Sequence, residues 1–237
     1  MLSAEALRLA AIEVLCPTAA AEAGGGFPTL AGSRVFDSRA ASLEDLDRTS
    51  GYTPVLALYT PESGVSLRGP LASVDDVVAD AMLDIVAELA VASRDDQGEF
   101  ADAMAETDPE ARLVLAALCS QVRYLLERSQ SGGIWRYLVN HIIKIEAQTF
   151  AVPNLGLRWQ RVTMRFHCEI RDDDFGGETD GLPEPIATVF SALPDNSYAK
   201  AKLASLGAHF SRDARVPLQG IDGDFGAPTP GFKVDFS

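Results

Sequence analysis

The chain has 237 residues, of which 47% are hydrophobic and 23% charged, and its formal net charge is −14. This composition is typical of a globular protein with a real core, and the length fits one large domain or one domain with an extension. The acidic excess argues against general nucleic-acid binding, which needs a basic surface. Asp84 and Glu88 interrupt the apolar run 81–92, so we expect no membrane span. The first residues lack the basic region of a secretory signal, and three cysteines without metal-type spacing favour a reducing compartment.

The N-terminal part of the chain predicts a helix followed by two short strands. Ser3 can cap a helix over 4–15, which Cys16 and Pro17 would end. The Ala/Gly-rich stretch 19–28 is predicted to be a loop. A short strand, an acidic turn, a continuous apolar strand and a closing turn are then expected at 34–38, 42–47, 54–59 and 60–64.

The middle of the chain predicts a strand, a helix and a hairpin. Residues 81–93 alternate with a period of two, which favours a strand, although Ala, Leu and Glu also favour helix. Asp108 and Pro109 form a clear helix start, and apolar residues at helical spacing continue this helix to about 126. A short helix, an extended segment and a hairpin turn are expected next, at 134–141, 142–150 and 152–156.

The segment 157–171 carries the clearest pattern in the chain. From Arg161 to Arg171 apolar and polar residues alternate without a break, as in a strand with one face in a core. The apolar face is predicted to contain Val162, Met164, Phe166, Cys168 and Ile170. The other face has three arginines. On so acidic a chain, such a face is expected to meet an acidic surface, most simply that of another copy of the same protein.

The composition changes after Arg171, which suggests a domain over 1–171 and a C-terminal extension over 172–237. An acidic, Gly-rich linker is predicted at 172–181, and short helices are predicted at 185–193 and 197–210. The remainder is predicted to be an irregular arm with too little periodicity to fold alone. Its aromatic residues could dock on a partner: Phe225, Phe232 and Phe236.

No motif in the sequence predicts a catalytic residue, a metal site or a cofactor site. Two Asp-Phe-Gly triplets, at 174–176 and 224–226, lack the other parts of a kinase, and the acidic turns do not match a calcium loop. There is no recognisable nucleophile elbow, zinc motif or phosphate-binding glycine motif. Because catalytic residues can be dispersed along a chain, an enzyme remains an alternative.

Several segments, taken in chain order, carry a resemblance to a known family. The opening helix has the sequence LRLAAIEVL (7–15), and RVFDSR (34–39), EDL (44–46) and TPVLALY (53–59) follow it. A central strand, a helix and a last strand complete the series at 83–92, 109–126 and 159–170. In this order they resemble the tail terminator protein of long-tailed, lambda-type bacteriophages. The resemblance covers about 1–171. Residues 64–80 form a longer insertion than in compact members of the family, and 172–237 have no counterpart.

The resemblance implies an α+β fold with a mixed or antiparallel sheet of about four to five strands, two to three helices and an irregular C-terminal extension. It also implies a hexameric ring that caps the tail tube, stops its polymerisation and offers the surface that joins the filled head. The partners would be other copies of the chain, the tail tube protein and a head-completion or stopper protein. DNA would pass through the lumen without specific binding. The protein would be a virion component of the tail or neck, assembled in the cytoplasm of the bacterial host. Another neck, connector or tail-completion subunit is the alternative.

A ring closes through heterologous contacts, so one surface of each subunit must complement a different surface of its neighbour. We predict that the arginine face of 157–171 meets an acidic surface of the next subunit. Reversing the charges of Arg161 and Arg165 is then expected to give folded monomers. Trp135 and Trp159 are predicted to anchor packing, with an interface role as the alternative. The candidate interface residues are Arg158, Trp159, Arg161, Arg165 and Arg171, with Glu44, Asp45, Asp47, Asp84 and Glu88 as their complements.

Overall fold

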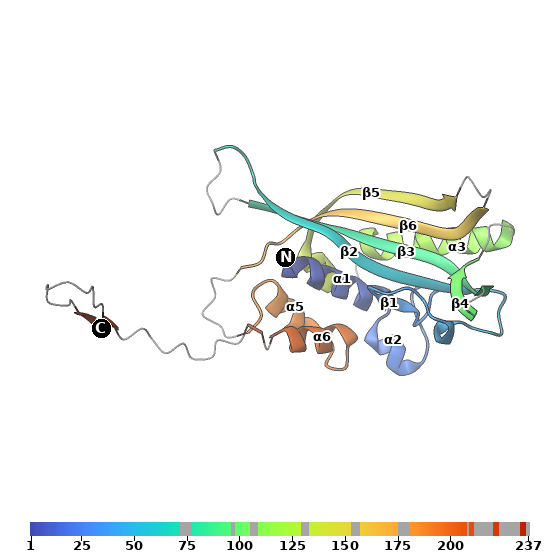
Figure 1. The fold of residues 1–237 in the computed structure, drawn as a ribbon, viewed down its shortest axis with the longest axis horizontal. Helices are drawn as coiled ribbons and strands as arrows, with labels where there is room; N and C mark the ends of the chain where they lie inside the picture. The colour runs from blue at the N-terminus through green and yellow to red at the C-terminus, as the bar shows by residue number, and fades with distance from the viewer. Residues whose placement is uncertain are drawn as a thin grey trace.

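The computed structural model describes residues 1–71, 77–95, 98–104, 109–128, 133–152, 157–174, 181–207, 209–210, 220–222 and 233–235. Within these ranges only the backbone is described at 94–95, 151–152, 157–159, 220–222 and 233–235. The chain has the predicted α+β fold, in which helices cover one face of a mixed sheet (Figure 1). No helix in the described ranges combines the length and the apolar character needed to cross a membrane.

The main sheet has six strands in the described part of the chain, with the order β1-β2-β3-β6-β5 and with β4 paired to β3. The strands are β1 (Val35–Asp37), β2 (Thr53–Leu67), β3 (Val77–Asp95), β4 (Gly98–Ala103), β5 (Val139–Val152) and β6 (Leu157–Ile170). The short edge strand β1 runs parallel to β2, and every other pair is antiparallel. Two short C-terminal strands, β7 (Gly220–Asp222) and β8 (Lys233–Asp235), pair with each other.

The helices pack in two layers below one face of the sheet (Figure 1). They are α1 (Leu2–Leu15), α2 (Thr18–Ala23), α3 (Pro109–Arg123), α4 (Gly133–Leu138), α5 (Ile186–Ala192) and α6 (Tyr198–Gly207), with short turns η1 (Leu43–Asp45) and η2 (Tyr124–Arg128). α1 and α3 contact the sheet directly, and α5 and α6 contact α1. The helices α5 and α6 therefore belong to the same core as 1–171, and a boundary at Arg171 does not divide that core.

The core forms where the apolar faces of β3 and β6 meet α1 and α3. Leu83 and Ile85 of β3, Phe166 of β6, Leu7 of α1 and Leu118 of α3 are all fully buried. Burial of a side chain of this size stabilises the fold by roughly 1.5–3 kcal/mol. Trp135 of α4 lies in the same core, as predicted, and its indole N–H donates to the carbonyl of Leu126 at 3.0 Å.

The start of α1 differs from the sequence prediction. The helix begins at Leu2, and Ser3 does not cap it because Asp173, far along the chain, supplies the acceptor. The Asp173 carboxylate accepts hydrogen bonds from the backbone N–H groups of Leu2 (2.8 Å) and Ser3 (2.7 Å) and from the Ser3 hydroxyl. This carboxylate accepts from N–H groups that a helix leaves unpaired at its start, and its negative charge interacts favourably with the positive end of the helix dipole.

Several other elements also differ from the sequence prediction. The predicted loop 19–28 contains α2, where Glu13 accepts hydrogen bonds from the backbone and the hydroxyl of Thr18, both at 2.8 Å. The predicted turn at 60–64 is part of β2, and the register with β3 shifts between Tyr59 and Glu62. β4 was not predicted, and β7 and β8 lie in the segment that was predicted to be an irregular arm. The arm residues Phe225, Phe232 and Phe236 lie outside the residues whose side chains are described.

Candidate subunit interface

The sheet face that points away from α1 and α3 carries the charged residues of β3 and β6. We name this surface the outer face; it contains Asp80, Met82, Asp84, Val86 and Glu88 of β3 with Arg161, Thr163, Arg165, His167 and Glu169 of β6. The predicted alternation in 157–171 is confirmed, because Met164, Phe166, Cys168 and Ile170 are buried on the other face. Val162 packs against the core while only partly buried.

The arginines of the outer face form ion pairs with acids of the same chain. Arg165 donates from Nε to Oδ1 of Asp84 at 2.8 Å and from Nη2 to Oδ2 at 2.7 Å. Arg161 donates from Nε to Oε2 of Glu88 at 2.6 Å. Each pair joins residues directly opposite each other in the β3–β6 register, where cross-strand side chains are within contact. The hydrogen bonds to Asp84 raise the pKa of the Arg165 guanidinium above its ordinary value.

Asp84 and Glu88, which we predicted to complement the arginine face of a neighbouring subunit, form ion pairs with arginines of their own chain. The two acids are largely covered, with side-chain exposures of 13% for Asp84 and 9% for Glu88. Their charges balance Arg161 and Arg165 inside one chain, so this pair of strands leaves no surplus positive charge for a partner. Whether the outer face contacts another subunit is still a prediction.

The charged network continues onto β5 and β4. Glu146 of β5 accepts a hydrogen bond from Lys144 Nζ at 2.7 Å and lies 2.8 Å from His167 Nε2. The Lys144 hydrogen bond and then the His167 contact lower the pKa of the Glu146 carboxyl. Asp102 of β4 lies 3.7 Å from Arg161 Nη2. The sequence prediction placed His167 on this face but missed Lys144, Glu146 and Asp102, although Lys144 and Glu146 alternate with apolar residues and could have been placed there.

Among the described contacts, the acids of the turn form no ion pair with the arginine face, although Leu46 of the turn packs in the same apolar cluster as Val86 of the outer face. Asp45 forms a bidentate ion pair with Arg39, at 2.7 and 3.1 Å, and accepts from the backbone and hydroxyl of Ser42, which lowers the pKa of its carboxyl. Asp47 accepts hydrogen bonds from the hydroxyl and backbone of Thr49, which also lowers its pKa. These contacts are local, so the turn supports its own conformation.

The remaining predicted residues lie in different environments. Arg171 lies beyond the end of β6, with its guanidinium 4.4 Å from the centre of the Tyr137 ring, and its N–H donates to Leu138. Glu44 is exposed in η1. The side chains of Arg158 and Trp159 are outside the described side chains. The structure thus brings together four of the predicted residues and distributes the others around the sheet.

Both edges of the sheet have strand segments with no neighbour among the described residues. β5 is one edge, and on it Ile143 is 66% exposed. At the other edge β1 pairs only with Leu56–Leu58 of β2, so the later part of β2 has a neighbour on one side alone. That part includes Val65 and Leu67, which are 46% and 54% exposed. Proteins usually protect such edges from other chains, so exposed apolar residues there indicate a contact surface.

Two of the hollows on the described surface lie at the ends of the sheet and beside the helices. One of about 300 Å³ lies beside Tyr137 and Glu169, and one of about 500 Å³ lies between α1, α2, β1 and α6. In the second, Tyr198 donates to Asp37 at 2.9 Å, and burial followed by this bond raises the Tyr198 pKa to about 12. Burial raises the pKa of the Cys168 thiol to about 12, so this sulfur is a poor nucleophile. Among described residues, no group of three or more His, Cys, Asp or Glu side chains is arranged to hold a metal ion.

Comparison with known proteins gives no relative: no protein-family model, no curated protein and no solved structure matches this chain.

Proposed function

We propose that this chain is a tail terminator of a long-tailed bacteriophage, which forms a ring on the last ring of the tail tube. The observation that carries the proposal is that one sheet has two different open edges, β5 and the later part of β2. A closed ring needs two different complementary surfaces on each subunit, and these edges offer such a pair. The ring would stop tube polymerisation and present a surface to a head-completion or stopper protein.

The element order supports the same proposal. The chain runs from α1 through β1, the acidic η1 and the β2–β3 pair to α3, and then to the β5–β6 pair. This is the order of segments on which the resemblance to tail terminators rests. The net charge of −14 suits a ring through which DNA moves, because an acidic lumen repels phosphate and does not hold it.

The test is a deletion of the gene in the phage that encodes it, followed by electron microscopy of the lysate. We expect tail tubes of abnormal length that fail to join filled heads, and restoration of normal particles when the intact protein is supplied. Free tails of normal length beside filled heads would instead identify a neck or connector subunit and would contradict the proposal. Normal, complete particles would remove the structural role and leave the enzyme alternative.

A further inference from the structure

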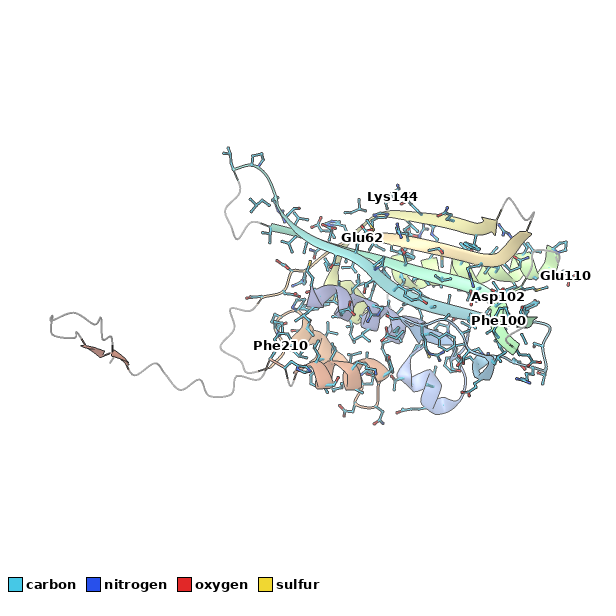
Figure 2. All side chains as sticks on the ribbon, in the orientation of Figure 1. Glu62, Phe100, Asp102, Glu110, Lys144 and Phe210 are labelled. Atoms are coloured by element: carbon cyan, nitrogen blue, oxygen red, sulfur yellow. The ribbon has the colours of Figure 1, made fainter. Side chains whose placement is uncertain are left out.

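We infer that the ring contact is head to tail, with the edge of β2 at 62–67 in one subunit lying along β5 of the next. We name these residues of β2 the arm edge. The inference rests on the ring-forming part of the proposed function, and the partner is a second copy of this chain. Figure 2 shows Glu62, the first residue of the arm edge, and Lys144, on β5.

The directions of the strands fit this contact. The β2–β3, β3–β6 and β6–β5 pairs are all antiparallel, so β2 and β5 run in opposite directions within one subunit. If two subunits stand side by side in the same orientation, the arm edge of one is therefore antiparallel to β5 of the other. The arm edge pairs regularly with Val77–Met82 of β3, which holds it straight over about 20 Å.

Apolar side chains at the two edges are exposed to solvent, and contact with a second subunit would bury them. Ile143 has no partner in the β5–β6 register, which passes from Ile142 to Lys144, so it occupies a bulge. Bulges redirect side chains, and this one leaves Ile143 two-thirds exposed at the border of the sheet. On the arm edge Val65 and Leu67 are about half exposed. Contact between the edges would bury apolar surface on both subunits.

The charges are complementary in the same alignment. Glu62, Met82, His167 and Lys144 lie in one row across the sheet, from β2 through β3 and β6 to β5. A second subunit added without sliding along the strands would place its Glu62 beside Lys144 and its Val65 beside Val139. The pairing is then confined to Val139–Lys144 of β5, because β1 occupies the same edge of β2 at Leu56–Leu58. A two-fold pairing of β5 with β5 would instead close a dimer and leave the arm edge uncovered, which does not build a ring.

The test uses two full-length variants that block one edge each. Ile143→Lys alters β5, and Val65→Lys with Leu67→Lys alters the arm edge. We expect sedimentation analysis over a wide range of concentrations to show assembly of the wild-type chain and only monomers of 25.3 kDa for each variant. An equimolar mixture of the two variants should give a dimer of twice that mass, because one intact arm edge meets one intact β5 and the complex cannot extend further.

Leu113→Lys is the matched control, since Leu113 of α3 is 71% exposed and lies away from both edges, and this variant should assemble like the wild type. Circular dichroism of all variants confirms that they are folded. Monomers in the mixture, or normal assembly of the arm-edge variant alone, would overturn the head-to-tail contact. A wild-type chain that never assembles would overturn it too. If the purified wild-type chain assembles as expected but the gene deletion still gives normal tails, the terminator role is excluded while the contact between subunits is supported.

A charge exchange refines the alignment. Lys144→Glu and Glu62→Lys should each weaken assembly at least several-fold, and the double variant should recover most of the loss. Within a subunit two strands, β3 and β6, separate Glu62 from Lys144, and Lys144 contacts Glu146 there, so recovery requires contact between subunits. Matched controls of equal charge change on α6 and just before it, Lys202→Glu and Asp195→Lys, should leave assembly unchanged. Absence of recovery in the double variant would overturn the alignment of Glu62 with Lys144.

Discussion

The two faces of the same pair of strands, β3 and β6, show how differently apolar and charged patterns constrain a structure. On the inner face Leu83 and Phe166 are buried against helices, as their spacing predicts. On the outer face the neighbouring positions, Asp84 and Arg165, form an ion pair with each other. Apolar side chains need only to be buried against other apolar groups, whereas charged side chains need a particular residue of opposite charge. That partner is set by strand register, so the outer face is understood only when the register is known.

The inner face should dominate stability. Phe166→Ala removes a fully buried ring between the sheet and the helices and should lower the free energy of unfolding by about 3–5 kcal/mol. Chemical denaturation measures the change, with the exposed Leu113→Ala as a control that should shift it by less than about 0.5 kcal/mol. Equal effects of the two substitutions would show that this face is not the core.

The outer face should contribute less than the inner face to the free energy of unfolding, and this contribution should be measurable in the monomer. The double variant Arg161→Glu with Arg165→Glu places four carboxylates together, two of them largely covered, and should cost about 2–3 kcal/mol. The cost is below that of a fully buried pair because the Arg165 side chain is 39% exposed. Thermal and urea unfolding at a concentration where the chain is monomeric measure this cost. Arg123→Glu, in the exposed ion pair with Glu127, is the control.

This experiment separates two accounts of the arginines. The sequence pattern predicts monomers that still fold after charge reversal. The ion pairs predict a destabilised chain before any assembly is considered. If the double variant is as stable as the wild type but no longer assembles, Arg161 and Arg165 act in the contact between subunits.

The contact between Asp173, after β6, and the start of α1 should contribute less to the free energy of unfolding. Asp173→Ala removes the acceptor for two N–H groups of α1 and should cost about 1–2 kcal/mol. Hydrogen exchange should then increase first at the start of α1. Glu44→Ala, at an exposed position in η1, is the control and should leave exchange at the start of α1 unchanged. Unchanged exchange at Leu2 and Ser3 would contradict this role of Asp173.

The smallest effect is expected at the acidic turn. The ion pair with Arg39 lowers the pKa of Asp45, so the stabilisation is complete above the ordinary carboxyl pKa of about 3.9 and is lost as pH falls towards the lower pKa of the folded state. Because Arg39 is half exposed, the contribution should stay below about 1 kcal/mol. Asp45→Asn should remove that part of the pH dependence in acid unfolding, and a curve identical to wild type would contradict it.

Sequence patterns predict those elements whose signals are local. Alternation located β3 and β6, and the proline at position 109 marked the start of α3. The later part of β2 was missed because Pro61 and Gly64 favour a turn, whereas pairing with β3 keeps the chain extended. α2 was missed because its alanines adjoin a run of glycines, and Glu13 supplies hydrogen bonds that stabilise its start. Arg161 and Arg165 were recognised as a charged face, but their partners depend on contacts more than seventy residues away in the chain.

The carboxylate of Asp173 has a consequence for the order of synthesis. A ribosome makes α1 first, but the group that completes the start of this helix is added only after most of the chain has emerged. Any chain released before that point has an unfinished first helix and also lacks α5 and α6 from its core. Truncated products are therefore unable to adopt the shape of a finished subunit. The proposed ring would in this way be protected from incomplete subunits.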